Sequence, residues 1–261
     1  RITQIKAQIE ETTSDYDREK LDKFDVRWKG RDYSWKLRNI LPKVLVAGQT
    51  AGFLTEKGAR LLDPTGTLQP GAPMCPPEGD VGTGMVATNS VAPRTGNVSA
   101  GTSSFLMVVL ERALEKLHVE VDIVTTPVGV PAAMVHSNTC TSEADAWVHM
   151  FGEVASTLGC AVERSVLYEL LYKKAMDSDS DCGGLLAFNY FSGEPIIGIE
   201  EGRPLFVRKP ESRMTLGNFM RAQLYSAVAT LKLGFNILMY EESVELDRLT
   251  GHGGLFKTEG V

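Results

Sequence analysis

The sequence predicts an α/β fold in which helices are layered on a sheet. Apolar segments of strand length alternate with amphipathic segments of helical length, and tight turns rich in small residues lie next to several of the strands. Such alternation is typical of layered α/β folds. Hydrophobic residues make up 43% of the 261 residues, which is enough for a substantial core.

The composition argues against several classes of function. The formal net charge of -6 disfavours a general nucleic-acid binder, which needs a basic surface to displace counterions from phosphates. A small anionic ligand remains compatible, because backbone amides can hold phosphate without net positive charge. No apolar run reaches the ~20 residues of a membrane span, and the segment RITQIKAQIEETT lacks the apolar core of a secretory signal.

The four cysteines, Cys75, Cys140, Cys160 and Cys182, form no C-x-x-C pair and have no histidine nearby at zinc-ligand spacing. We interpret them as reduced thiols of a cytoplasmic protein and predict no metal site built from them. The chain begins with Arg1 and not with methionine. We therefore expect a processed product or a fragment.

The N-terminal part is expected to start as a helix and to change character near Ile40. Residues 1–28 carry apolar side chains at helical spacing among many charges, and a polar connection follows. The run LPKVLVAGQ, residues 41–49, predicts a strand entering a turn. A short helix with Thr55 as its N-cap comes next. Residues 63–79 are crowded with proline and glycine, which predicts a loop.

Beyond that loop, strands and helices are expected to alternate. Strands are expected within residues 97–111 (two, joined by a small-residue turn), 118–128, 132–139, 184–195 and 246–261. Helices are expected to start within 81–96 and to cover 141–159, 165–176 and 215–240. The last of these helices is apolar on most sides, so we expect it to be buried.

Three short motifs carry the candidate chemistry: Glu78–Gly84, Ser99–Ser104 and Thr250–Lys257. Each is a tight turn of small residues beside an expected strand. Small residues let backbone N–H groups approach a ligand closely, and successive amides can bind an anion. Each motif alone is also explained as an ordinary structural turn.

Together the motifs resemble the FGGY family of carbohydrate kinases, over residues 40–261. The segment LPKVLVAGQTAGFLTEKGARLL is similar to the family's exit from the hinge, and Gly79-Asp80 to the pair that supplies the catalytic base. SAGTSS resembles the GTS turn, GLLAFNYFSGEP the segment ending in SGE, and LDRLTGHGGLFK the strand and glycine turn that holds adenosine. Five motifs occur in the family's order.

The resemblance implies an actin-like ATPase fold of the ribonuclease H-like type, a mixed sheet with flanking helices. It assigns residues 1–39 to the tail of an N-terminal sugar-binding domain and the hinge, and residues 40–261 to an incomplete C-terminal nucleotide-binding domain. The family's D-x-G-T phosphate loop and the helices after the adenosine turn have no counterpart in the sequence. We therefore expect this chain alone to be inactive and name a homodimer as a possible assembly.

The implied reaction is ATP-dependent phosphorylation of a hydroxyl of a small sugar, with a ketopentose such as xylulose or ribulose as the leading substrate and Mg²⁺ bridging the phosphates. Such a reaction needs a carboxylate that accepts the hydroxyl proton. Asp80 would be that base, and Gly79 and Asp80 would contact the sugar. The residues assigned to the nucleotide by the resemblance are Gly101, Thr102, Ser103, Gly253, Gly254, Leu255 and Lys257.

Simpler interpretations remain for single residues. Asp80 could be only a helix N-cap, the Thr102 hydroxyl could bond its own turn, and Lys257 could be a solvated surface lysine. His252 stands where the family often has glycine, and we interpret it as a packing or surface residue. Ser142, where relatives carry a small residue near the nucleotide, is equally explained as a helix cap.

Two other functions are weighed against the sugar kinase. A non-catalytic relative could keep the nucleotide fold as a binding or regulatory module, but the retained Asp80 disfavours it. An actin-like ATPase could hydrolyse ATP without a sugar, but the hinge and SGE motifs disfavour that function.

Overall fold

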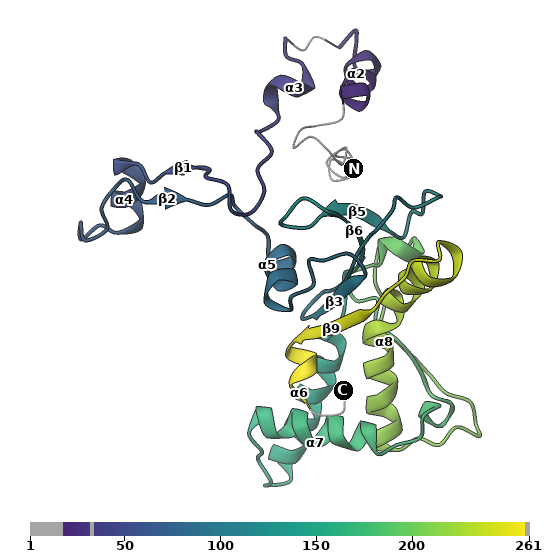
Figure 1. The fold of residues 1–261 in the computed structure, drawn as a ribbon. Helices are drawn as coiled ribbons and strands as arrows, with labels where there is room; N and C mark the ends of the chain where they lie inside the picture. Colours follow the sequence, from purple (N-terminus) through teal and green to yellow (C-terminus); the bar gives the residue numbers. More distant parts are fainter. Residues whose placement is uncertain (1–17, 32–33, 259–261) are drawn as a thin grey trace.

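A computed structural model describes residues 18–31 and 34–258 (Figure 1). The helix expected over residues 1–28 is confirmed for α2 (Arg18–Arg27), and its first 17 residues lie outside the described part. The polar connection contains one short helix, α3 (Leu37–Ile40), that was not expected. Its first N–H group donates to Asp25 Oδ1 at 3.0 Å, which ties α3 to α2.

An arm extends from the rest of the molecule between α3 and α5 (Figure 1). It consists of β1 (Gly52–Phe53), α4 (Glu56–Leu62) and β2 (Pro73–Met74), and the two strands pair antiparallel. Thr55 is confirmed as the N-cap of α4, because its Oγ1 accepts the Gly58 N–H at 3.0 Å. The expected loop therefore also contains β2.

The prediction of a strand over residues 41–49 is wrong. This segment is extended but joins no sheet. Ala47 N–H donates to the Pro127 carbonyl at 2.7 Å, and the Gln49 side chain accepts the Val46 N–H at 3.0 Å. The Val46 side chain packs beside the β5–β6 turn, 3.1 Å from the position that a Cβ at Gly129 would take. The apolar run therefore packs through its side chains without the strand pairing that we expected.

The centre of the molecule is a mixed sheet of five strands in the order β5-β6-β4-β3-β9. Neighbouring strands pair antiparallel except β9, which runs parallel to β3. The strands are β3 (Thr95–Ala100), β4 (Ser104–Val109), β5 (Asp122–Thr125), β6 (Pro131–Ser137) and β9 (Arg248–Gly253). All four sequence ranges expected to contribute these strands are confirmed.

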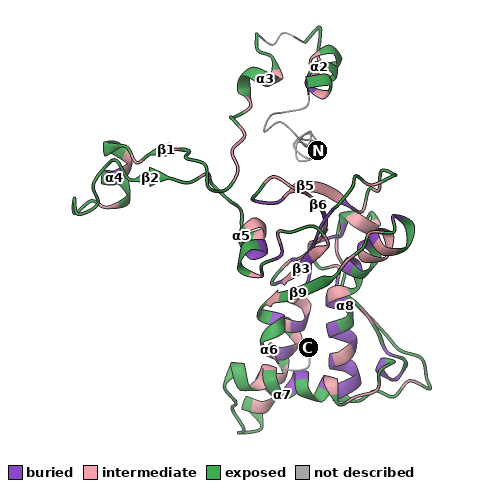
Figure 2. Ribbon diagram, in the orientation of Figure 1, coloured by how far each residue is buried: buried purple, intermediate pink, exposed green. Residues whose placement is uncertain are grey.

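Helices cover both faces of this sheet. On one face lies α5 (Asp80–Ala87), whose Met85 packs with Met107 and Val109. On the other lie α6 (Ser142–Thr157), α7 (Arg164–Met176) and α8 (Leu216–Asn236). Ala100 packs into that second core, and Figure 2 shows buried residues along α8. The expectation that the long C-terminal helix is buried is confirmed, because twelve of its residues are buried.

Shorter elements complete the fold. The remaining elements are β7 (Leu186–Phe188), β8 (Leu205–Val207), the 3₁₀ turns η1 (Cys182–Gly184), η2 (Pro195–Ile197) and η4 (Gly254–Lys257), and the π-helix η3 (Ile237–Glu241). The strands β7 and β8 form a separate antiparallel pair beside α8. No described helix is long and apolar enough to cross a lipid bilayer.

Candidate active site

The turn between β3 and β4 is hydrogen-bonded to the two residues that lead into α6. The Gly101 carbonyl accepts both the N–H (3.2 Å) and the hydroxyl (3.0 Å) of Thr141, and the Thr102 carbonyl accepts the Cys140 N–H at 2.9 Å. In a trans peptide the C=O and the following N–H point in opposite directions. The N–H groups of Thr102 and Ser103 therefore point away from α6, towards the exposed side of the turn.

These two amides are available to a ligand. Neither the Thr102 nor the Ser103 N–H donates a hydrogen bond to any residue that the structure describes, and Thr102 is exposed. Successive free N–H groups in a turn form an anion-binding site. The turn therefore has the geometry of a small phosphate site, and the Thr102 hydroxyl has no bond to its own turn.

The glycine turn after β9 lies beside this first turn. The parallel register pairs Ala100 with Gly253 at the last position of both strands. Gly253 has φ +106°, and a Cβ there would lie 2.3 Å from the Ala100 carbonyl oxygen. Only glycine fits this position, and its fit brings the Gly101–Ser103 and Gly253–Gly254 turns together.

The residues after Gly254 separate into core and surface. The Leu255 side chain is buried in the cluster that contains Ala100. Only the backbone of Leu255 is therefore available to contact a ligand. Lys257 ends η4 with an exposed side chain. A Cβ at Gly254 would meet nothing within 4 Å.

Asp80 is the first residue of α5, and Gly79 occupies the N-cap position. The Asp80 Oδ1 accepts the N–H of the next residue, Val81, at 2.9 Å, and the side chain is otherwise exposed. The simple N-cap interpretation of Asp80 is therefore wrong. Its carboxylate lies at the N-terminus of α5.

Sequence reasoning missed the buried carboxylate that supports the first turn. Glu194 is fully buried, and its Oε2 accepts the Ser137 hydroxyl at 2.8 Å and the Asn138 N–H at 3.1 Å. Asn189 donates to the Cys140 carbonyl at 3.0 Å. The loop after β7 thus holds the segment that in turn holds Gly101 and Thr102. The SGE motif was the one signal in the sequence, but nothing local in it indicates this contact.

The start of α6 differs from the expectation for Ser142. Thr141, not Ser142, occupies the N-cap position of α6, and its hydroxyl bonds the Gly101 carbonyl and not the helix. Ser142 as a cap is therefore wrong. Burial raises the pKa of the neighbouring Cys140 thiol to about 11. All four cysteines are free.

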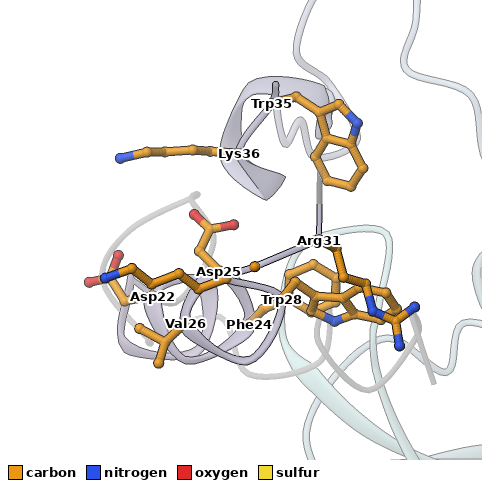
Figure 3. A pocket seen from close by; sticks show the side chains of 10 residues that line it. Asp22, Phe24, Asp25, Val26, Trp28, Arg31, Trp35 and Lys36 are labelled. Carbon is orange, nitrogen blue, oxygen red and sulfur yellow. The ribbon is translucent and has the colours of Figure 1, made fainter. Parts of the chain in front are cut away.

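A cavity of about 510 Å³ lies elsewhere, between α2 and the segment that leads to α3 (Figure 3). Phe24 stacks on Trp28 with ring centroids 5.6 Å apart, and the Arg31 guanidinium lies 4.4 Å from the Trp28 ring centroid. Its lining comes from one local stretch of chain, residues 22–36, and includes none of the predicted site residues. We assign no binding function to it.

A mixed sheet with helices on both faces, and two small-residue turns side by side at the ends of β3 and β9, define a layered α/β domain. Solved structures share this fold. The xylulose kinase from Bifidobacterium adolescentis is 21% identical with a TM-score of 0.54, and the match covers 74% of this chain and 35% of that one. Ligand-bound xylulose kinase from Lactobacillus acidophilus is 14% identical with a TM-score of 0.64, covering 94% and 45%.

The gluconate kinase from Lactobacillus acidophilus is 13% identical with a TM-score of 0.63, covering 94% of this chain and 44% of that one. A comparison with curated proteins gave no match. Residues 96–261 match the model of the FGGY family of carbohydrate kinases, C-terminal domain. The chain belongs to this family and has its actin-like ATPase fold. It spans 35–45% of the length of these three structures.

Proposed function

We propose that this chain is the nucleotide-binding part of a longer sugar kinase that transfers the γ-phosphoryl group of ATP to a sugar hydroxyl. One observation carries the proposal. Thr141 and Cys140 hold the carbonyls of Gly101 and Thr102, so two free amides face outward directly beside the Gly253–Gly254 turn. Phosphoryl transfer depends chiefly on positioning and charge neutralisation, and this arrangement supplies preorganised donors.

In this proposal the phosphates of ATP lie against the Thr102 and Ser103 amides, and adenosine lies against Gly253 and Gly254. Lys257 and the Leu255 backbone border the nucleotide. Residues 40–261 form the nucleotide-binding domain, and residues 1–39 belong to the hinge and the end of a sugar-binding domain. The match spans less than half of each solved kinase, which supports a longer protein, and residues 96–261 match the family's C-terminal domain, which supports the first of these assignments.

Asp80 acts as the general base, and together with Gly79 it faces the sugar. The carboxylate is exposed at the start of α5 and accepts a bond only from its own helix among the described residues. It is therefore free to accept a proton from a substrate hydroxyl.

The cation enters with the nucleotide. The described residues contain no group of three acidic, histidine or cysteine side chains placed to hold a metal. Mg²⁺ in kinases is bound mainly by phosphate oxygens and waters with one or two carboxylates, so no dedicated cage is needed. The ion would neutralise the developing charge on the phosphates.

A ketopentose is the proposed substrate, since two of the matched structures are xylulose kinases. A gluconate kinase matches equally well, so the fold does not choose the sugar. The test is an ADP-coupled assay of the longer polypeptide with ATP, Mg²⁺ and a panel of pentuloses, hexoses and gluconate. ATP hydrolysis that no sugar stimulates would favour an ATPase without a sugar substrate.

The base is tested by comparing Asp80→Asn with Glu78→Gln. We expect kcat to fall by roughly 10²–10⁴ in Asp80→Asn, the scale of general base loss, with little change in ADP affinity. Glu78 is also exposed, and its Oε1 accepts the Gly79 N–H at 3.0 Å, a bond that glutamine can keep. Glu78→Gln should therefore keep its activity. Near-normal turnover of Asp80→Asn would remove Asp80 from the mechanism.

A further inference from the structure

His252 connects the glycine turn to the helix that carries Asp80. It is the penultimate residue of β9 and pairs with Ser99 of β3. Paired residues of neighbouring strands point to the same face, and the imidazole lies on the face covered by α5. A Cβ at Gly84 would lie 2.8 Å from both Cε1 and Nε2 of the ring. The ring therefore occupies the space beside α5 that any larger residue at position 84 would need.

A hydrogen bond fixes the ring in this place. Asn97 Nδ2 donates to His252 Nε2 at 3.0 Å across the two parallel strands. Asn97 is 1% exposed, so its amide has no access to bulk water. A buried donor that loses its partner is costly, which makes this ring position well determined.

The contact joins two parts of the candidate site. His252 directly precedes Gly253, which lies against Ala100. Gly84 lies four residues after Asp80, about one helical turn along α5. A shift of the ring would therefore change the position of the α5 N-terminus relative to the glycine turn.

We propose that His252 is a positioning residue that sets the Asp80 carboxylate relative to the bound nucleotide, an inference that rests on the proposed kinase function. In this role it acts through α5 and not by contact with substrate or nucleotide. Its contribution is to hold α5 at one distance from the turn, through its contact with Gly84 and its bond with Asn97. A misplacement of about 1 Å at a reacting group can lower a rate by about 10²-fold.

Three variants of the longer polypeptide test this role, with ATP, Mg²⁺ and the sugar that gives the highest turnover. His252→Leu keeps the bulk but removes the acceptor, and should lower kcat roughly 10- to 100-fold with the KM for ATP nearly unchanged. His252→Gln offers a side-chain oxygen to Asn97 and should restore most of the turnover. Gly84→Ala pushes on the ring from the other side and should reproduce the kcat loss, even where His252→Leu fails to fold.

The control is His149→Gln, which changes an exposed histidine of α6 and should leave both constants unchanged. Wild-type kcat in His252→Leu or Gly84→Ala would overturn the positioning role and leave the kinase function standing. A rise in the KM for ATP as large as the fall in kcat would also overturn it, and so would a His252→Gln variant that does not restore turnover. A wild-type protein with no turnover on any sugar and no ADP binding would overturn the kinase function and this role together.

Discussion

Replacing Gly253 with alanine is expected to force apart the ends of β3 and β9. Gly253 has φ +106° and ψ −178°, a region that is essentially restricted to glycine. The added Cβ would lie 2.3 Å from the carbonyl oxygen and 2.9 Å from the carbonyl carbon of Ala100, and both distances are under the 3.0 Å that real Cβ atoms keep. The neighbour is backbone of β3, which is paired with β4 on one side and β9 on the other, so it cannot move aside as a flexible side chain would.

The expected cost has two parts. Backbone strain at such a position is about 1–3 kcal/mol, and losing a ladder hydrogen bond at the strand end adds about 1 kcal/mol. The free energy of unfolding should therefore fall by about 2–4 kcal/mol. For a chain of this size that corresponds to a fall in Tm of roughly 5–15 °C.

Gly254→Ala is the matched comparison. Its Cβ would meet nothing within 4 Å and its φ is not left-handed, so its stability should stay within about 0.5 kcal/mol of wild type. Thermal and urea unfolding measure stability, and calorimetry measures ADP binding. If the turn holds adenosine, Gly254→Ala weakens ADP binding without destabilising the fold, whereas Gly253→Ala does both. A wild-type Tm for Gly253→Ala would refute the steric argument.

Three further outcomes concern the unmodified chain. Burial raises the pKa of Cys140 to about 11, and the thiolate is the reactive form, so iodoacetamide at neutral pH should modify the exposed Cys75 and Cys160 first. Peptide mass spectrometry that finds Cys140 modified as fast would contradict this. Under the proposed function, the 261-residue chain alone should phosphorylate no sugar, because it spans less than half of the matched kinases and the groups that position the sugar would lie in the rest of the longer polypeptide. Turnover equal to that of the longer polypeptide would contradict it. Phe53 and Leu61, 66% and 80% exposed, should promote self-association of the isolated chain, measurable by light scattering.

Elements whose signals are local could be predicted from the sequence. Apolar segments on either side of SAGTSS predicted the β3–β4 hairpin, because two strands joined by a tight turn need only neighbouring residues. The Thr55 cap and the apolar α8 were predicted for the same reason. The apolar run at residues 41–49 could not be predicted correctly, because it packs near Gly129 and the choice between pairing and packing depends on that distant partner.

The candidate site also has parts that the sequence predicts and parts that it does not. The ligand-facing turns follow from small residues beside strands, which a sequence displays directly. Their supports do not, because they are long-range contacts. Asn97 and His252 are separated by 155 residues, and Ser137 and Glu194 by 57. Local patterns carry no information on such pairs, so His252 was interpreted as a packing or surface residue without its partners, and Glu194 was given no role.

The glycines of the three motifs fall into two kinds. At Gly82, Gly84, Gly251 and Gly253 the protein itself fills the space of a side chain, with the Glu78 side chain, the His252 ring, the Phe256 ring and the Ala100 carbonyl respectively. At Gly79, Gly101 and Gly254, one in each motif, a Cβ would have no protein atom within 3.4 Å, and φ is not left-handed. Gly79 is the N-cap of α5, a position where glycine is favoured. Glycine costs conformational entropy on folding, so packing and backbone geometry leave Gly101 and Gly254 unexplained. Under the proposed function, a ligand that approaches the backbone closely at these two adjacent turns would explain both glycines, and the free amides of the β3–β4 turn would bind that same ligand.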